Sequence, residues 1–214
     1  MRAGAFYHDV GKIVKPNYYS ENQASVEDKK VHFKISPHMS ALVIKNHVRE
    51  GIEIARKYGL SQKVIDFIPQ HHGTSLIRYF YQEAVRQYEN SESAEPVREE
   101  DFRYPGPKPQ TIEAAIVMLA DSVEATATSK LSEATVREDD IRLVVRNSIL
   151  EKFNDGQFVE CNLTLRDLHR ISESFIKTLL SRYHHRITYP ALIEKKEDRE
   201  ELRPELKPST SAVR

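Results

Sequence analysis

Six side chains of this sequence are of the types that bind metal ions and catalyse hydrolysis: His8, Asp9, His47, His71, His72 and Asp121. Asp121 follows the apolar run Ala114–Ala120 on a predicted helix. An ionised acid inside a helical core is costly unless a cation, a charged partner or several hydrogen bonds accompany it. A metal ion would supply that cation. Imidazole and carboxylate ligands without thiolates favour first-row divalent metals such as iron, manganese, zinc and nickel.

The number of candidate ligands indicates more than one ion. Four histidines and two aspartates exceed the ligands of one tetrahedral ion, and they suit a pair of ions bridged by a carboxylate and a water. Two divalent ions would outweigh the charge of two aspartates and leave a cationic site that attracts phosphates. The chemistry predicted from these residues is metal-assisted phosphoester hydrolysis.

A few further residues are candidates for substrate contact. Lys12 lies four residues after His8, so on a helix it would share the face of His8 and reach a phosphate. Arg103, Tyr104 and Lys108 combine two cations with an aromatic face on a proline-rich loop, which suits phosphates and an adenine. The alternatives are a solvated lysine and a purely structural loop.

The elements that must position these residues are predicted to be helices, so the expected fold class is all-α. Glycine and proline, 7 and 10 residues, fall mostly at joints between apolar periodic segments. We expect helices over residues 3–13, from Ser36 to just before Gly59, from Ser61 to the His71–His72 pair, over 75–88 and over 111–130, and two more that begin near Thr135 and Thr164. Residues 17–34 and 89–110 are expected to be loops.

Several of these helices carry capping signals. Ser36 and Pro37 fit an N-cap and a first-turn proline. Thr135 and Thr164 are each followed three residues later by an acid, the spacing of a reciprocal cap. The last helix carries an apolar stripe that predicts a core-facing surface: Leu165, Leu168, Ile171, Phe175, Leu179 and Tyr183.

Composition excludes several classes of function. The 214 residues include 32 basic and 32 acidic ones, so the zero net charge does not indicate a DNA or RNA partner. A single cysteine, Cys161, allows no internal disulfide, which favours a reducing cytoplasm. The longest apolar run, Ala114–Ala120, is far shorter than the roughly 18 residues that span a bilayer, and the first residues do not fit a secretory signal.

Four segments make the sequence similar to a known family: Gly4–Lys12, Gln70–Thr74, Asp101–Pro109 and Met118–Ala125. With the order and spacing of the histidines, they resemble the HD superfamily of metal-dependent phosphohydrolases, in particular the cytosolic HD domain of seven-transmembrane HD receptors, the PgpH-type cyclic di-AMP phosphodiesterases. The resemblance implies an HD-domain helical bundle over residues 1–189 around a binuclear metal site. Residues 190–214 are charged and are expected to form a disordered tail.

The resemblance also implies a division of the ligands between two divalent ions, most often iron or manganese. His8, Asp9 and Asp121 would bind the first ion, and Asp9 would bridge to a second ion held by His47, His71 and His72. Family members supply one more histidine to the first ion from an upstream helix. This chain starts seven residues before His8, so we expect its N-terminal helix to be truncated.

The implied activity is hydrolysis of a cyclic dinucleotide, cyclic di-AMP to pApA, by a metal-bridged hydroxide, with Asp9 and Lys12 as catalytic residues. The alternatives are hydrolysis of a guanosine alarmone or a nucleoside triphosphate, and nucleotide binding without turnover because one metal ligand is missing. The resemblance implies membrane association only through a longer parent protein, on the cytosolic face of the cell membrane. The long apolar helices are also compatible with a homodimer.

Overall fold

The computed structural model describes residues 1–22, 28–90, 96–131 and 136–184, and this part of the chain is built from helices. Its α-helices are α1 (Arg2–Tyr7), α2 (Pro37–Lys57), α3 (Gln62–Ile65), α4 (Phe67–Gln70), α5 (Arg78–Glu89), α6 (Ile112–Lys130), α7 (Glu138–Asn154) and α8 (Leu165–His184). Short 3₁₀-helices are η1 (Val10–Val14), η2 (Pro16–Tyr18), η3 (Ser20–Asn22), η4 (Asp28–Lys34) and η5 (Glu99–Phe102). Over these residues there is no strand beyond one isolated bridge between Leu76 and Arg103. The predicted all-α fold class is confirmed.

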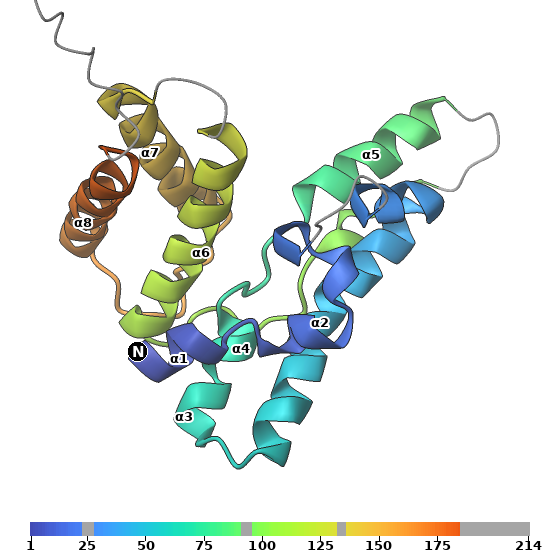
Figure 1. Ribbon diagram of the computed structural model, residues 1–214, viewed down its shortest axis with the longest axis horizontal. Coiled ribbons are helices and arrows are strands. Elements are labelled where there is room, and N and C mark those ends of the chain that lie inside the picture. The colour runs from blue at the N-terminus through green and yellow to red at the C-terminus, as the bar shows by residue number, and fades with distance from the viewer. Residues whose placement is uncertain (23–27, 91–95, 132–135, 185–214) are drawn as a thin grey trace, which may run out of the picture.

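The helices form two arms that diverge from a common base (Figure 1). One arm contains α6, α7 and α8, the other contains α2 and α5, and α1, α3 and α4 lie at the base. Phe67 of α4 packs against Ala114 and Val117 of α6 and so joins the base to the first arm. The candidate ligands come from the base and from both arms, which is why this junction matters for the site.

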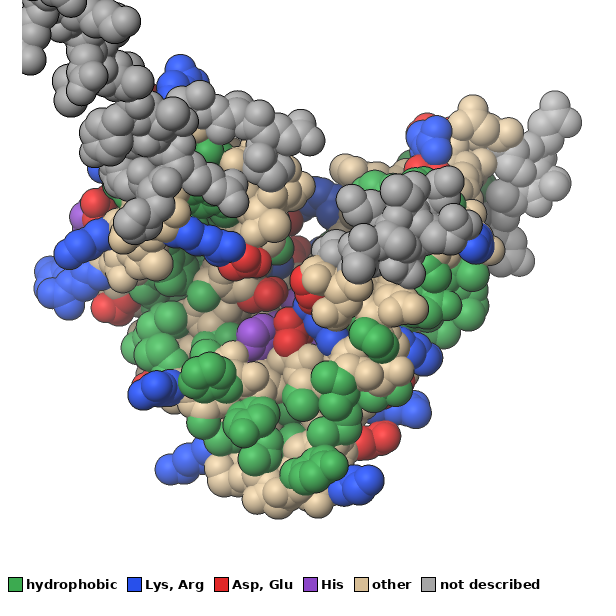
Figure 2. Space-filling view, viewed as in Figure 1, with side chains coloured by type: hydrophobic (Ala, Val, Ile, Leu, Met, Phe, Trp, Pro, Cys, Tyr) green, Lys and Arg blue, Asp and Glu red, His purple; other side chains and the backbone are tan. Residues whose placement is uncertain are grey.

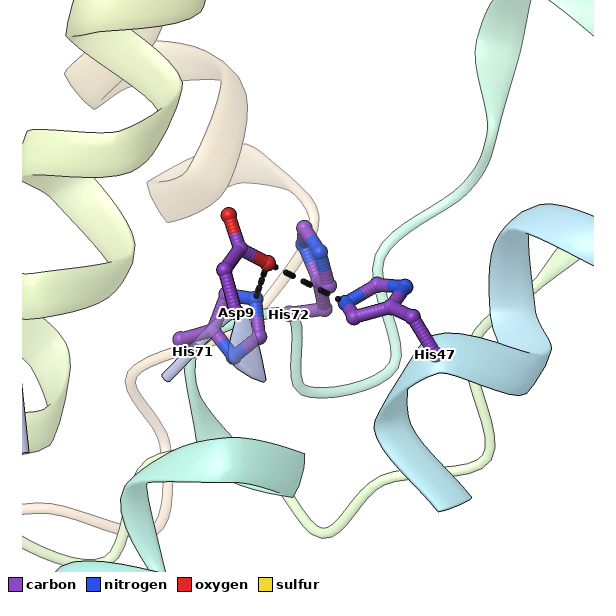
Figure 3. Close-up of side chains that lie close together, drawn as sticks. All are labelled: Asp9, His47, His71 and His72. Carbon is purple, nitrogen blue, oxygen red and sulfur yellow. Dashed lines mark ion pairs between the residues drawn. The ribbon is translucent and has the colours of Figure 1, made fainter. Parts of the chain in front are cut away.

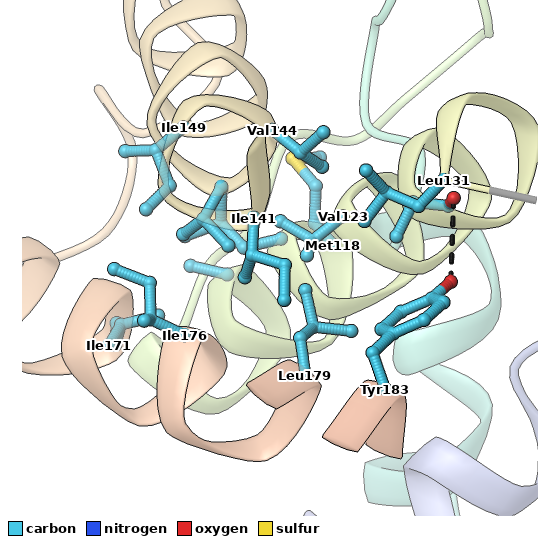
Figure 4. Packing of buried hydrophobic residues seen from close by; sticks show 14 of the residues in the cluster. Met118, Val123, Leu131, Ile141, Val144, Ile149, Ile171, Ile176, Leu179 and Tyr183 are labelled. Atoms are coloured by element: carbon cyan, nitrogen blue, oxygen red, sulfur yellow. Dashed lines mark hydrogen bonds between the residues drawn. The ribbon is translucent and has the colours of Figure 1, made fainter. Parts of the chain in front are cut away.

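The larger core lies between α6, α7 and α8 (Figure 4). Met118 and Leu119 of α6 and Val145 of α7 are fully buried there. From α8, Ile171, Ile176, Leu179 and Tyr183 are buried in the same cluster, and Leu168 and Phe175 pack against it. The predicted apolar stripe of this helix is therefore confirmed, except at its first turn, where Leu165 is 74% exposed.

Most of the predicted caps are present. The Ser36 hydroxyl accepts a hydrogen bond from the Met39 amide at the start of α2, as predicted. Thr111, which was not predicted as a cap, accepts one from the Ala114 amide at the start of α6. Thr164 and Asp167 cap α8 reciprocally, as predicted. The prediction of a helix start at Thr135 is wrong.

The helix predicted near Thr135 begins further along the chain. Arg137 is the N-cap of α7 and Glu138 its first residue. Asp140 accepts hydrogen bonds from both the backbone amide and the guanidinium of Arg137, so this acid fixes the start. Thr135 itself lies outside the described residues, as do the predicted boundary at residue 189 and the predicted tail.

The helix predicted over residues 3–13 is interrupted. α1 ends at Tyr7, the backbone departs from helical geometry at Asp9, and the 3₁₀-helix η1 follows. Gly11 of η1 lies directly against α2, where a Cβ atom on it would come within 1.9 Å of the His47 carbonyl oxygen and 2.6 Å of the Gly51 nitrogen. Glycine permits this approach, which sets Asp9 beside His47.

The loop that precedes α6 is tied to the chain after α4. The Tyr104 amide donates to the Ser75 carbonyl, and the Ile77 amide donates to the Phe102 carbonyl. These bonds keep residues 75–77 extended, so α5 begins at Arg78 and not at Ser75 as predicted. In the described part of the chain, no helix is long and apolar enough to cross a membrane.

Candidate metal centre

The six predicted ligands come from four separate places in the fold and meet at the junction of the two arms. His8 and Asp9 follow α1, His47 lies within α2, His71 and His72 follow α4, and Asp121 lies within α6. Figure 2 shows acidic and histidine side chains at the base of the hollow between the arms. Two overlapping groups have ligand atoms within 4.8 Å of one another: Asp9 with His47, His71 and His72, and Asp9 with His8 and Asp121.

Asp9 lies at the centre of the arrangement (Figure 3). Its Oδ1 atom is 3.4 Å from the Nε2 atoms of both His47 and His71. Its Oδ2 atom is 3.2 Å from His8 Nε2. One carboxylate thus faces histidines of both groups through different oxygens, which is the geometry that a bridging ligand needs.

Asp121 of α6 is the third member of the group that contains His8 and Asp9. Its Oδ1 atom lies 3.8 Å from His8 Nε2, and its Oδ2 atom lies 4.0 Å from His72 Nδ1. The side chain is 24% exposed and faces this cluster. The acid predicted to require a cation is therefore placed where one could bind both it and His8.

Backbone contacts fix the orientation of three of the histidine rings. In each case Nδ1 lies within hydrogen-bond distance of the carbonyl oxygen three residues earlier: His8 with Ala5 at 2.8 Å, His47 with Ile44 at 2.6 Å and His71 with Ile68 at 2.7 Å. A carbonyl oxygen can only accept, so a neutral ring carries its proton on Nδ1 and presents the Nε2 lone pair. Such contacts are typical behind metal-ligating histidines.

The inward-facing atoms need a cation. His47 Nε2, His71 Nε2 and Asp9 Oδ1 are buried and lack a hydrogen-bond partner among the described residues. When Nδ1 holds the proton, two nitrogen lone pairs face a carboxylate oxygen at 3.4 Å, and burying such groups unpaired is costly. A divalent ion would satisfy all three atoms, so the residues present fit a metal site.

The electrostatics differ between the two groups. Burial opposes protonation of His8, but its contacts with Asp121 and Asp9 outweigh burial and raise its pKa to about 10. Burial, aided by the nearby His71, lowers the pKa of His47 to about 4. Burial disfavours an ionised Asp9, yet His71 and His8 hold the pKa of this carboxyl far below its usual range. His47 is therefore ready to bind a metal, whereas His8 must first lose a proton.

Lys12 lies beside the centre and has two acidic partners, and its predicted contact with a substrate phosphate stays a prediction. Its ammonium lies 2.7 Å from Asp9 Oδ2 and 2.6 Å from Glu21 Oε1. Burial opposes the charge, but Asp9 and Glu21 raise the pKa of Lys12 above its usual value. It is a fixed positive charge beside Asp9. Glu21 was missed from the sequence, because nothing in a polar loop distinguishes one glutamate from its neighbours.

The three predicted contacts of the proline-rich loop occupy different positions. Arg103 forms a two-armed ion pair with Asp155, at 2.8 and 3.2 Å, and also contacts Glu99 and the Thr74 carbonyl. This network connects the loop to the end of α7. The substrate role of Arg103 stays a prediction. Tyr104 is buried and stacks on His72, with ring centroids 4.1 Å apart.

Lys108 lies elsewhere, beside the turn that follows α7, with its Nζ atom 3.9 Å from the position of a Cβ atom on Gly156. Its substrate role also stays a prediction. The sequence analysis did not identify Lys152 of α7, which contacts Ser75 close to the centre. Lys152 lies on a helix with many charged residues, so nothing in the sequence distinguished it from lysines and arginines that face solvent.

Comparison with known proteins identifies the family of this chain. The pattern of the HD domain family matches residues 1–126. The chain is 42% identical over 194 residues to the cyclic-di-AMP phosphodiesterase PgpH of Bacillus subtilis, covering 91% of this chain and 26% of that protein. It is 40% identical to the protein of the same name from Listeria monocytogenes, covering 89% and 25%. The chain thus spans about a quarter of the length of these curated relatives.

Solved structures extend the comparison to the fold. The crystal structure of the L. monocytogenes phosphodiesterase PgpH HD domain matches with a TM-score of 0.74 at 38% identity, covering 86% of this chain and 81% of that one. The structure of that domain in complex with cyclic-di-AMP matches with a TM-score of 0.76 at 37% identity, covering 85% and 80%. Family pattern, sequence identity and fold all agree: the chain belongs to the HD domain family and is a PgpH-type HD domain.

Proposed function

We propose that this chain is the catalytic domain of a metal-dependent phosphodiesterase that hydrolyses cyclic di-AMP. The observation that carries the proposal is the convergence of His47 Nε2 and His71 Nε2 on Asp9 Oδ1, all buried and without hydrogen-bond partners in the described part of the chain. Such an arrangement is favourable around a bound cation. The similar L. monocytogenes domain in complex with cyclic-di-AMP supports the choice of substrate.

The proposed ligand sets are the two groups that the geometry forms. Asp9, His8 and Asp121 would hold one divalent ion, and Asp9 with His47, His71 and His72 would hold the other. Iron and manganese suit these nitrogen and oxygen donors. When bound, such ions supply Lewis acidity toward phosphate oxygens and lower the pKa of water to near neutrality.

The protein's own residues then have distinct roles. Asp9 lies between His8 and His47, and its two oxygens belong to both ligand groups, so it fixes the position of one group relative to the other. Lys12, 2.7 Å from Asp9, adds positive charge where an anionic substrate phosphate arrives. In the overall reaction one water adds across a P–O3′ bond, and the ring opens to pApA with a free 3′ hydroxyl and a 5′ phosphate.

The setting of this domain in the cell also follows from the proposal. Because the chain spans about a quarter of its curated relatives, we expect it to act within a longer membrane-associated protein whose HD domain lies in the cytosol. A homodimer of this domain stays a prediction that light scattering on the purified chain would check.

The deciding experiment combines metal counting with product analysis. The chain is purified without oxygen, its iron and manganese are counted, and cyclic di-AMP is added while products are separated by chromatography. We expect close to two ions per chain and pApA as product. His47→Gln should remove one ion and most of the activity. His38→Gln, at an exposed histidine on the same helix α2, is the matched control and should change neither.

Other outcomes would contradict the proposal. Faster turnover of a guanosine alarmone or a nucleoside triphosphate than of cyclic di-AMP would assign the same centre to another nucleotide. Tight binding of cyclic di-AMP with no product at full metal occupancy would make this a binding domain.

A further inference from the structure

A cavity adjoins the candidate metal centre on the side of α7. Its volume is about 260 Å³, and it shares three residues with the centre and its surroundings: His72, Tyr104 and Asp121. The remaining polar wall consists of Ser75 after α4, Ser122 and Thr126 of α6, and Ser148, Glu151 and Lys152 of α7. A pocket beside a metal centre in which several polar groups converge next to an apolar wall is a candidate substrate site.

Lys152 is the cation of this cavity. Its ammonium donates to the Ser75 hydroxyl at 3.0 Å, and an ammonium has three protons to donate. Among the described residues no carboxylate pairs with it within 4.0 Å. Burial lowers the pKa of Lys152, and the nearby Glu151, Asp121 and Asp155 offset only part of this effect, so an anionic ligand would stabilise its charge. Ser75 thus orients a half-buried lysine whose remaining donors are available to a ligand.

The composition of the pocket points to an anionic group with a neutral, partly apolar attachment. Leu76, Ile77 and Ala125 line it together with hydroxyl groups of Ser122 and Ser148. Hydroxyl groups and apolar side chains suit a ribose and a base, and an ammonium suits a phosphate. A free inorganic anion would leave the apolar part of the wall without a partner.

A cyclic dinucleotide carries two phosphodiesters, and only one of them is cleaved at a time. The other keeps its negative charge and must enter a partly buried site, where an unpaired charge is costly. We propose that this cavity receives the half of the cyclic dinucleotide that is not being cleaved, with Lys152 bound to its phosphodiester. The inference rests on the proposed function and adds a residue that selects a substrate with two phosphates.

The test compares one substrate that has a second phosphodiester with one that lacks it. Lys152→Met, Lys152→Arg and the control Lys63→Met, at an exposed lysine of α3, are assayed with cyclic di-AMP and with bis(p-nitrophenyl) phosphate. We expect Lys152→Met to lower kcat/KM for cyclic di-AMP at least about tenfold more than for the single diester, in line with loss of one charged contact. Lys152→Arg should recover part of the loss, and Lys63→Met should match the wild type with both substrates.

A binding measurement separates this inference from the proposed function. The metal-free chain is titrated with cyclic di-AMP by calorimetry, and Lys152→Met should weaken binding about tenfold while Lys63→Met does not. Equal losses on both substrates, or wild-type binding and turnover of cyclic di-AMP by Lys152→Met, would overturn the role of Lys152. If the wild type hydrolyses neither substrate, the proposed function fails, and the calorimetric comparison still decides whether the cavity binds the dinucleotide.

Thermal unfolding establishes that the variants are folded. If Lys152→Met does not fold, Ser75→Ala serves in its place, because it removes the hydroxyl that orients the ammonium. It should then weaken cyclic di-AMP binding more than it affects the single diester, and equal effects on both would count against the inference.

Discussion

The ring of Tyr104 lies almost parallel to that of His72, with centroids 4.1 Å apart and an angle of 15° between the planes. This contact connects the proline-rich loop to the metal centre. The loop is in turn held by the bond from the Tyr104 amide to the Ser75 carbonyl and by the ion pair of Arg103 with Asp155. The tyrosine predicted to stack on a substrate base thus stacks on a candidate ligand.

Removing that ring should weaken metal binding. Groups that orient ligands typically contribute about 10- to 100-fold to metal affinity, so Tyr104→Leu should lose about tenfold at the site of His47, His71 and His72, measured by competition with a chelator. Tyr104→Phe keeps the stacked ring and serves as the control. Wild-type affinity in the leucine variant would show that His72 does not need this support.

Asp9 should be the single residue whose loss empties both sites. Its two oxygens face His8 on one side and His47 and His71 on the other, so Asp9→Asn should reduce bound metal from about two ions to fewer than one and lower turnover at least about 1000-fold. Elemental analysis and a product assay check this. Glu53→Gln, at an exposed acid of α2, should behave as wild type, and retention of both ions by Asp9→Asn would contradict a bridging role.

Gly11 should be intolerant of any side chain because of where it lies. A Cβ atom there would meet the His47 carbonyl and the Gly51 nitrogen of α2, so Gly11→Ala should destabilise the fold by about 3 kcal/mol and displace His47. Gly59→Ala is the comparison. Gly59 has a φ of 68° with nothing within 4 Å of an added Cβ, so only backbone strain of about 1 kcal/mol applies. Denaturant unfolding measures both, and equal effects would refute the close-approach explanation.

The metal-free chain should lose stability as the solution becomes alkaline. Burial lowers the pKa of His8, but the contacts with Asp121 and Asp9 outweigh burial and raise this pKa from 6.5 to about 10. Because the folded pKa exceeds the unfolded one, this stabilisation is fully present below about pH 6.5 and is lost as the pH rises through about 10. Thermal unfolding of chelator-treated protein across this range should show a falling Tm.

The variant His8→Gln isolates this contribution. A neutral side chain has no proton to lose, so the difference in Tm between wild type and His8→Gln should shrink from pH 6.5 toward pH 10. A constant difference over that range would mean that His8 is not held as an imidazolium by its two acids.

The sequence by itself determined the helical class, most helix starts and the identity of the clustered residues. Ser36, Thr111 and Thr164 cap helices through contacts with residues three positions away, and such local interactions can be recognised in a sequence. The candidate ligands were recognisable because an aspartate in an apolar helix and an adjacent pair of histidines are unusual in an ordinary core.

Only the tertiary structure determined the helix boundaries and the side-chain partners that depend on contacts between distant segments. The break after Tyr7 exists because Gly11 packs on α2, and the late start of α5 exists because residues 75–77 pair with the loop before α6. Lys12 contacts Glu21, Arg103 contacts Asp155 and Lys152 contacts Ser75, which lie 9, 52 and 77 residues away in the chain. Long charged side chains have many exposed alternatives in a helical sequence, so only the packing of the two arms selects which of them face the centre.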